Sequence, residues 1–237
     1  MHKTIGLNGV TVEYEFEIKR VRNINLRIRH DGTVFVSCGR YTSEEAVRRF
    51  LIEKADFILR NIAREKEKAV NACRPKDYSD GEKVKVFGDV CTIRVVRKTK
   101  GRARAELVYP EVILYVSDPA DFAERQRVYE KFRKDTITSK IDEMCGYYGP
   151  MFAAKGVRMP GEIRIRKMTS KWGLCRPKSG ILTFNSNLFE VPEEAVAYVV
   201  VHEYAHLIHA DHSKRFYAEV ASVMPDWKKR REVLNEY

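Results

Sequence analysis

Apolar and polar residues alternate over residues 9–36, as they do in β-strands that bury one face. Two such runs, at 10–18 and 24–28, precede a turn at Asp31-Gly32, and a third run follows at 34–36. The Asp-Gly pair predicts a hairpin at that turn, and the three runs together predict a β-meander. Beyond a linker rich in turn-forming residues at 74–81, further alternating runs at 84–95 and 112–116 predict more strands.

The spacing of apolar residues becomes helical after residues 42–45, Thr-Ser-Glu-Glu, a sequence typical of a helix N-terminus. We expect one helix over residues 46–62, ending in the charged run at 64–68. A long helix is predicted from Phe122, and the Gly-Pro pair at 149–150, or Gly146 before it, is expected to end it.

Two short alternating runs, 162–166 and 181–184, predict strands in the last third of the chain. Pro192 then opens a helix, with Glu193 and Glu194 at the positive end of the helix dipole. We expect this helix to reach about His209.

The change of pattern near residue 120 predicts two domains, a β-rich region at 1–120 with an inserted helix and a second domain at 121–237. The fold class predicted is therefore α+β. No internal repeat is visible in the sequence.

A chain of 237 residues with 44% hydrophobic residues can form a sizeable core. The longest apolar runs are far below the roughly 18–20 residues that span a bilayer, so no membrane helix is expected. The N-terminus lacks the features of a secretory signal, and the five cysteines form no CxxC pair. These features indicate a cytoplasmic protein with reduced thiols.

The net charge of +11 favours polyanions near the surface. The segments at 19–29, 94–104 and 228–231 are the basic stretches that nucleic acid could contact. Trp227 is the one aromatic residue beside the last of them, so a solvated helix face is the favoured interpretation there.

The segment of most chemical interest is His202-Glu203-Tyr204-Ala205-His206. Two histidines four residues apart on a helix share one face, and the glutamate beside the first can reach a metal-bound water. A buried helix does not accept such polar groups unless something pairs with them. We therefore expect one zinc ion per chain, bound by His202 and His206.

A catalytic zinc site needs a third protein ligand and an open position. His212 is the preferred candidate, because the chain can fold back if the helix ends near residues 210–211. Glu219 is the next choice, with Asp211 or His209 behind it. His209 is disfavoured because residues 202–209 of one straight helix extend over about 10 Å.

The reaction expected of such a site is hydrolysis. Zinc lowers the pKa of its bound water towards about 7. Glu203 is predicted to take the proton of that water, which attacks a peptide carbonyl, and to return the proton to the leaving group. The sequence thus predicts a metallopeptidase with Glu203 as its catalytic residue, with manganese or nickel as the alternative metals.

Several segments together resemble the YgjP-like metallopeptidase family, which is close to the WLM and SprT-like zinc proteases. They are residues 166–175, 182–185, 192, 198–203 and 212–216, with 22–34 in the N-terminal half. The resemblance implies a zincin-like C-terminal domain with an HExxH active-site helix. Lys171, Leu174, Tyr204 and Tyr217 depart from the family pattern, which puts substrate contacts in doubt but leaves the zinc chemistry intact.

If the resemblance holds, the loop at Trp172-Gly173 is expected to form a wall of the substrate cleft. The alternative for Trp172 is that it packs on a tight turn without contacting substrate. Cys175 is expected to be a buried small residue rather than a ligand.

The resemblance also implies an alternative function, nucleoside triphosphate pyrophosphatase, with a nucleotide in place of a peptide or protein substrate. Phosphate chemistry more usually employs magnesium held by carboxylates, whereas this sequence offers histidines, so peptide hydrolysis ranks first. A third reading is a basic nucleic-acid-associated protein in which zinc is structural. Such a site is closed by four protein ligands, and the sequence offers three.

Overall fold

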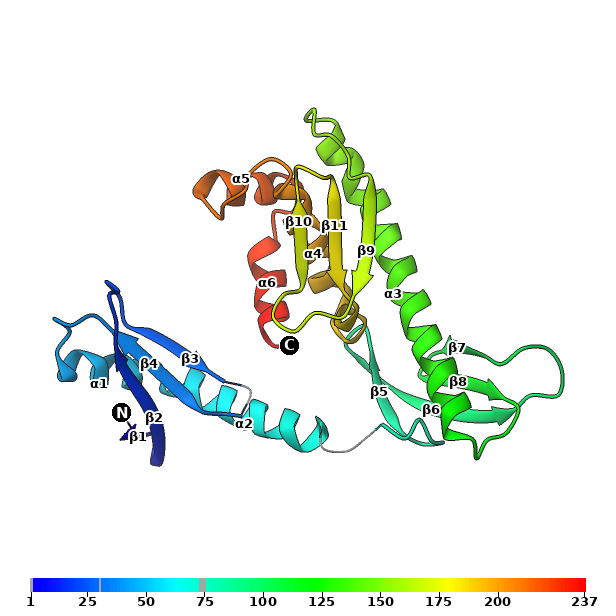
Figure 1. Ribbon diagram of the computed structural model, residues 1–237, viewed down its shortest axis with the longest axis horizontal. Helices are drawn as coiled ribbons and strands as arrows, with labels where there is room; N and C mark the ends of the chain where they lie inside the picture. The colour runs from blue at the N-terminus through cyan, green and yellow to red at the C-terminus, as the bar shows by residue number, and fades with distance from the viewer. Residues whose placement is uncertain (1, 30, 73–75) are drawn as a thin grey trace. The chain divides into compact units, whose positions relative to one another are not determined.

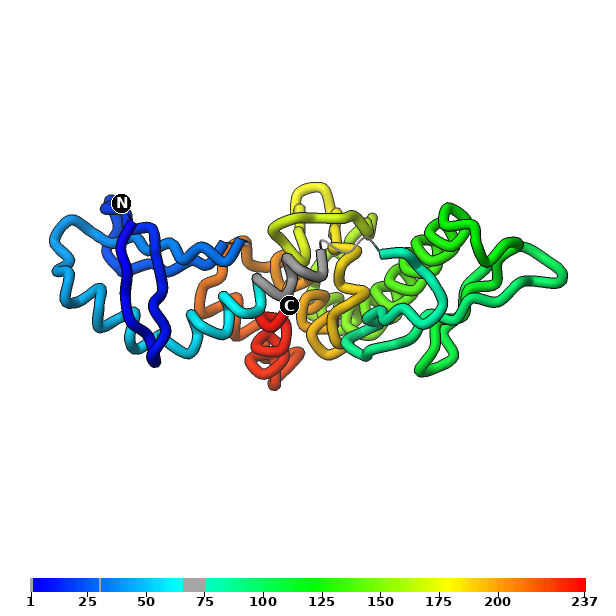
Figure 2. The backbone as a smooth tube through the Cα atoms, turned by 90° about the horizontal axis from the view of Figure 1, so that it is seen from below, coloured from blue at the N-terminus to red at the C-terminus, as the bar shows by residue number. Residues whose placement is uncertain are grey.

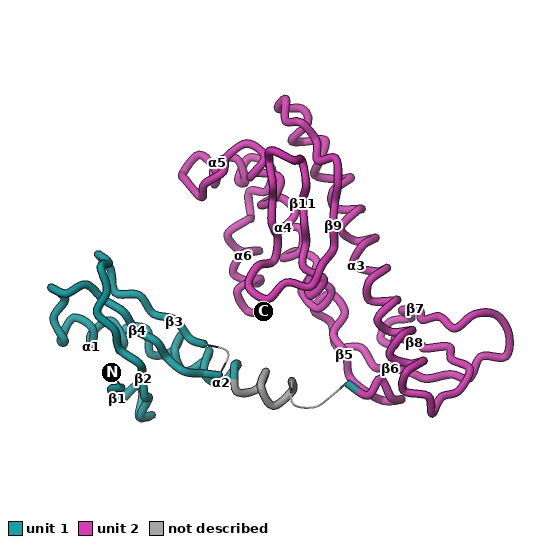
Figure 3. Tube along the Cα trace, viewed as in Figure 1, with its two compact units in different colours: residues 1–76 teal, residues 77–237 magenta. Residues whose placement is uncertain are grey.

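The structure is a computed structural model that describes residues 2–29, 31–72 and 76–237, with side chains except at 66–72. His30 of the predicted turn, Cys73, and residues 74 and 75 of the predicted linker lie outside the described residues. The chain forms two compact units, Met1–Lys76 and Asp77–Tyr237 (Figure 3). The boundary predicted near residue 120 instead falls inside the second unit, because the strands before it share a core with the helix after it.

The first unit contains a four-stranded sheet in the order β1-β2-β4-β3. Its strands are β1 (His2–Leu7), β2 (Val10–Ile18), β3 (Asn25–Ile28) and β4 (Val34–Cys38). The hairpin of β3 and β4 is confirmed, but the predicted meander is wrong, because β2 pairs in parallel with β4. Strand β1 was not predicted.

Two helices, α1 (Glu44–Glu53) and α2 (Ala55–Ala72), follow the sheet where one was expected. Ser43 caps α1 by accepting a hydrogen bond from the Ala46 N–H at 3.2 Å, as the sequence predicted. Helix α2 continues through the charged run that was expected to end it. Lys54 separates the two helices. The buried residues on either side of Lys54 keep a helical spacing, so the sequence pattern gives no sign that the helix is divided there.

The second unit opens with another four-stranded sheet, in the order β5-β6-β8-β7. Its strands are β5 (Lys83–Val86), β6 (Asp89–Arg97), β7 (Arg104–Val108) and β8 (Glu111–Val116). Strand β7 was not predicted, whereas the others were.

The two four-stranded sheets have the same strand order and the same strand directions. In each, an antiparallel pair is joined by a two-residue turn, Asn8-Gly9 or Phe87-Gly88, and the second strand then pairs in parallel with the fourth. Equivalent backbone hydrogen bonds follow the parallel pair, from Lys19 N–H to Cys38 O at 2.9 Å and from Lys98 N–H to Val116 O at 2.8 Å. The structure therefore contains a repeat that the sequence did not reveal.

Helix α3 (Phe122–Ala153) connects the second sheet to the rest of the unit (Figures 1 and 2). It contacts β7 and β8 and also α4, so it ties the two parts together. It runs past the predicted stop, with Pro150 in its last turn. Proline has no N–H to donate to the Gly146 carbonyl, so α3 lacks that one hydrogen bond near its end and continues for only three more residues.

The remaining elements surround α4 (Glu193–Ala205). They are a three-stranded sheet in the order β10-β11-β9, a short 3-10 helix η1 and two C-terminal helices. Their bounds are β9 (Glu162–Arg166), β10 (Gly173–Arg176), β11 (Ile181–Asn185), η1 (Ser186–Glu190), α5 (Lys214–Val223) and α6 (Trp227–Asn235). The protein is a mixed α+β protein, and eight of the eleven strands among the described residues precede α3, as predicted for a β-rich N-terminal half.

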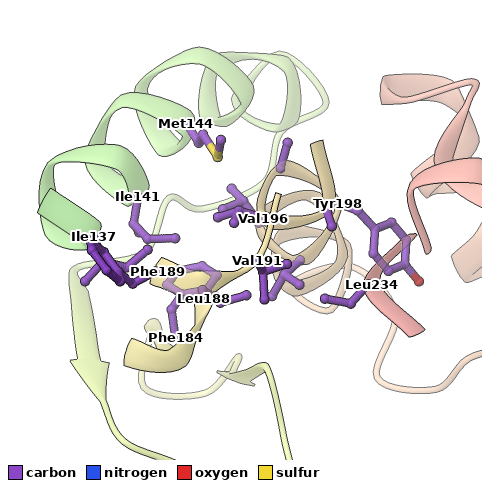
Figure 4. Packing of buried hydrophobic residues seen from close by; sticks show 14 of the residues in the cluster. Ile137, Ile141, Met144, Phe184, Leu188, Phe189, Val191, Val196, Tyr198 and Leu234 are labelled. Atoms are coloured by element: carbon purple, nitrogen blue, oxygen red, sulfur yellow. The ribbon is translucent and has the colours of Figure 1, made fainter. Parts of the chain in front are cut away.

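Helix α4 is buried on almost every side, which explains why its sequence is apolar without a polar stripe. Figure 4 shows Ile137, Ile141 and Met144 of α3 on one side of α4, with Tyr198 and Leu234 on another. Within the part of the chain that the structure describes, no helix combines the length and the apolar character needed to cross a membrane.

The turn between β5 and β6 packs against the start of α4. The Phe87 N–H donates to the Phe189 carbonyl at 2.8 Å. Gly88 has a φ of 90°, in the left-handed region, and a Cβ built there would lie 2.7 Å from Cγ of Pro192. Glycine is thus required at residue 88 both by backbone conformation and by contact with the helix.

Replacing Gly88 by alanine should lower the free energy of unfolding of the second unit by about 2–5 kcal/mol, the sum of left-handed strain and a collision. Gly101→Ala is the matched control, since Gly101 also has a positive φ but has open space around it. It should cost only the strain, about 1–2 kcal/mol. Denaturant unfolding followed by fluorescence measures both, because the two tryptophans, Trp172 and Trp227, lie in this unit. Equal losses in the two variants would mean that the turn does not press on Pro192.

Candidate metal centre

Three histidine side chains converge at the C-terminal end of α4. His202 lies in the last turn of the helix, His206 is its C-cap residue, and His212 lies in the segment before α5. The Nε2 atom of His212 is 3.0 Å from Nε2 of His202 and 3.1 Å from Nε2 of His206. One ring nitrogen from each histidine can thus face a common point, and these ligand atoms all lie within 4.8 Å of one another.

The structure brings together the three histidines that the sequence analysis preferred. Helix α4 ends at Ala205, earlier than the predicted His209, so the chain turns in time for His212 to fold back. The competing candidates do not join the cluster among the described residues. Glu219 forms an ion pair with Lys155, and His209 contributes its backbone carbonyl to the site rather than its ring.

Hydrogen bonds and ring contacts hold the histidines in place. Nδ1 of His206 lies 2.9 Å from the His209 carbonyl. A carbonyl only accepts, so Nδ1 carries the proton and Nε2 keeps a free lone pair. Phe216 is fully buried, and its ring centre lies 4.6–4.9 Å from those of all three histidines. The Tyr198 hydroxyl is 3.4 Å from Nδ1 of His202.

The electrostatic surroundings keep two of these rings neutral. Burial lowers the pKa of His202 to about 3, assisted by the neighbouring His206, His212 and Arg231 charges. Burial also lowers the pKa of His206, against the hydrogen bond to the His209 carbonyl, which raises it. Neutral imidazole is the form that binds a metal ion.

Glu203 lies beside the histidine cluster in a buried position, with 4% of its surface exposed. Burial raises the pKa of its carboxyl to about 8, while the Cys175 backbone N–H that donates to it and the charge of Lys171 act in the opposite direction. A Cβ atom at Gly173 would lie 2.6 Å from Cγ of Glu203. The carboxyl therefore occupies space that exists only because residue 173 is glycine.

Gly173→Ala should displace the Glu203 side chain and reduce turnover of any reaction that uses it. A displacement of about 1 Å can cost about 100-fold in rate, so we expect a loss of that order with the metal content unchanged. Gly161→Ala is the matched control, because a Cβ there meets no atom within 4 Å. The rate and the metal content of both variants are measured in parallel, and an unimpaired Gly173→Ala enzyme would show that the Glu203 position is not critical.

The cluster opens into a cavity of about 710 Å³. One wall is formed by residues 170–175, which include the first three residues of the edge strand β10, and another by Arg231, Leu234 and Asn235 of α6. Trp172 lines the cavity and also packs against the core, so both predicted roles describe it. Cys175 is partly buried with a free thiol, its side chain lies outside the ligand cluster, and burial raises the pKa of that thiol to about 12.

Asn185 positions this wall, a role that was not predicted from the sequence. Its side-chain amide donates to the carbonyls of Met168 and Lys171, each at 2.8 Å, and its Oδ1 accepts from the Met168 N–H at 3.2 Å. Asn185 is buried at the end of β11, where a polar residue after an apolar strand is the signal that could have indicated such a role.

Comparisons with known proteins add three findings. The family model described as "YgjP-like, metallopeptidase domain" matches residues 22–237. No curated protein matches the chain. The crystal structure of the metallopeptidase zymogen of Pyrococcus abyssi abylysin is similar at 25% identity and a TM-score of 0.34, over 39% of this chain and 87% of that chain.

Proposed function

Because the chain belongs to the YgjP-like metallopeptidase family, we propose that it is a zinc-dependent hydrolase that cleaves peptide bonds. In this proposal His202, His206 and His212 hold one zinc ion per chain, and Glu203 is the catalytic residue. The convergence of three imidazole nitrogens beside a buried carboxyl is the observation that supports it most directly.

The histidine cluster fits zinc well. Ligands about 2.0–2.1 Å from a tetrahedral ion lie about 3.3 Å from one another, close to the 3.0 Å and 3.1 Å separations in the cluster. Nitrogen ligands suit zinc, whereas magnesium and calcium prefer oxygen. Zinc held by three protein ligands keeps an open position, polarises a carbonyl group and lowers the pKa of the water it binds.

Glu203 has the placement that a proton carrier in peptide hydrolysis requires. The Cys175 N–H and the space left at Gly173 orient its carboxyl toward the cavity beside the histidines. During hydrolysis the ionised form of Glu203 would take one proton from the attacking water, whose oxygen bonds to the carbonyl carbon, and would then give that proton to the nitrogen of the leaving amine. The C–N bond breaks as the nitrogen is protonated, which leaves one carboxylic acid and one amine, so a single proton carrier suffices.

The surroundings of the cluster favour a peptide over a nucleotide. Strand β10 is an edge strand that lines the cavity, and the free backbone groups of an edge can pair with an extended peptide. Glu203 is the one acidic residue among the described residues that line the cavity, so a carboxylate set for magnesium and phosphates is absent from that lining.

The proposal is tested with zinc-loaded protein, a diverse synthetic peptide mixture and, separately, nucleoside triphosphates. Mass spectrometry should detect cleaved peptides, cleavage should stop with a zinc chelator and return with added zinc, and the triphosphates should remain intact. Hydrolysis of triphosphates without peptide cleavage would replace the peptidase by the pyrophosphatase alternative.

A further inference from the structure

Arg231 is an exposed residue of α6 that lines the cavity beside three aromatic rings. Tyr217 and Trp227 stack with ring centres 4.7 Å apart at 15°, and Tyr198 also stacks with Trp227, at 6.4 Å. The Arg231 guanidinium lies 6.0 Å from the Tyr217 ring centre and 5.8 Å from that of Trp227. These three aromatic residues form the aromatic stack, which limits the freedom of an otherwise flexible side chain.

Among the described residues, the charge of Arg231 has no ion-pair partner. No described carboxylate lies within ion-pair distance of Arg231, whereas the adjacent Arg230 pairs with Asp226 at 2.8 Å. Arg231 nevertheless lines the cavity that contains the histidine cluster. A cation held in place beside a cavity without an internal partner can accept one from a ligand.

The wall formed by residues 170–175 adds a second cation. Lys171 lies in the loop before β10, lines the cavity and, among the described residues, forms no ion pair. Glu203 is buried and serves the proposed reaction, so it does not offset both cations at the entrance. The cavity therefore presents a positive rim to a substrate that enters it.

We propose that Arg231 forms a subsite for a carboxylate of the peptide substrate, with Lys171 adding to the attraction from the other wall. This inference rests on the proposed peptidase function. The planar guanidinium matches a carboxylate with two parallel hydrogen bonds, which a solvated surface lysine does not provide. The carboxylate can belong to an acidic side chain near the scissile bond or to the C-terminus of the peptide, and the two sources are separated by experiment.

The test uses the best-cleaved peptide of a diverse synthetic mixture, resynthesised in three forms. One form is unchanged, one has its Glu and Asp residues replaced by Gln and Asn, and one carries a C-terminal amide. For the native enzyme, kcat/KM should be about 10-fold or more lower for one of the two neutralised forms than for the unchanged peptide. A lower value for the Gln/Asn form identifies an acidic side chain as the source of the carboxylate, and a lower value for the amide identifies the C-terminus.

Three variants connect that preference to Arg231. Arg231→Gln should bring the ratio of kcat/KM values close to one, mainly by raising KM for the charged peptide, and Arg231→Lys should keep part of the ratio. Lys229→Gln is the matched control. It removes one positive charge from the same helix, and Lys229 does not line the cavity. It should keep the native ratio. A ratio near one in the native enzyme, or an unchanged ratio in Arg231→Gln, would overturn the proposal.

A binding measurement separates this inference from the proposed function. Unlabelled alanine hexapeptides with one central glutamate or glutamine, and with a free or amidated C-terminus, are titrated calorimetrically into the zinc-loaded Glu203→Gln variant. A carboxylate should tighten binding about 10-fold, and Arg231→Gln in the same background should remove that gain. If the native protein cleaves no peptide, the proposed function fails while these dissociation constants still decide whether the carboxylate subsite exists.

Discussion

Replacing Glu203 by glutamine should strongly reduce the rate of hydrolysis while leaving one zinc ion per chain. Glutamine has nearly the same shape, so it fits the space beside Gly173, but it cannot carry the proton between water and leaving amine. General acid–base catalysis contributes about 10²- to 10⁴-fold, and we expect kcat to fall by that factor. Peptide cleavage rates and elemental analysis of the same preparations measure the two properties.

Glu219→Gln is the control for this variant. Glu219 lies outside the cavity lining and pairs with Lys155, so its replacement should preserve both metal and activity. Loss of zinc in Glu219→Gln would instead identify Glu219 as the third ligand. A Glu203→Gln enzyme with more than about one tenth of the native kcat would exclude Glu203 as the proton carrier.

Replacing His212 by alanine should remove zinc and activity together without unfolding the protein. The His212 side chain is exposed, and its ring contacts lie within the cluster and with Phe216 and Tyr217, so its loss leaves the core intact. Outer hydrogen-bond partners of ligands contribute about 10- to 100-fold to metal affinity, and a direct ligand should contribute more. Zinc content after dialysis against a competing chelator, with circular dichroism on the same samples, measures the effect.

His209→Ala is the matched control for His212, because it removes an imidazole three residues away and keeps the carbonyl that His206 needs. It should retain zinc. Retention of zinc by His212→Ala as well would leave only two histidine ligands and require a different third group.

The sequence predicts those parts of the fold that follow from neighbouring residues. The Asp31-Gly32 hairpin, the capped start of α1 and the apolar helix α4 each depend on a few adjacent side chains. Strand β7 was missed because it is only five residues long and none of its side chains is fully buried, although Arg104 and Glu106 do alternate with apolar residues. The parallel pairing of β2 with β4 was missed because strand β3 lies between them in the chain, and a local pattern does not reveal pairing between strands that are not consecutive.

In the candidate site, too, the sequence predicts the features that depend on neighbouring residues and misses those that depend on packing. The spacing of His202 and His206 follows from the helix alone, whereas the location of His212 depends on where α4 ends. The roles of Gly173 and Asn185 depend on contacts with residues more than ten positions away, and that of Arg231 depends on a cavity formed by several elements. Such relations arise from packing, which the order of residues does not express directly.

The repeated sheet carries an evolutionary consequence. Gly9 and Gly88 take the same place in equivalent turns, yet only Gly88 is pressed against Pro192. Identical connectivity with divergent side chains is what duplication of one ancestral segment would leave. In the second sheet the turn glycine is fixed by its contact with Pro192, whereas a Cβ at Gly9 meets no atom within 4 Å. Homologous sequences should therefore vary more at residue 9 than at residue 88.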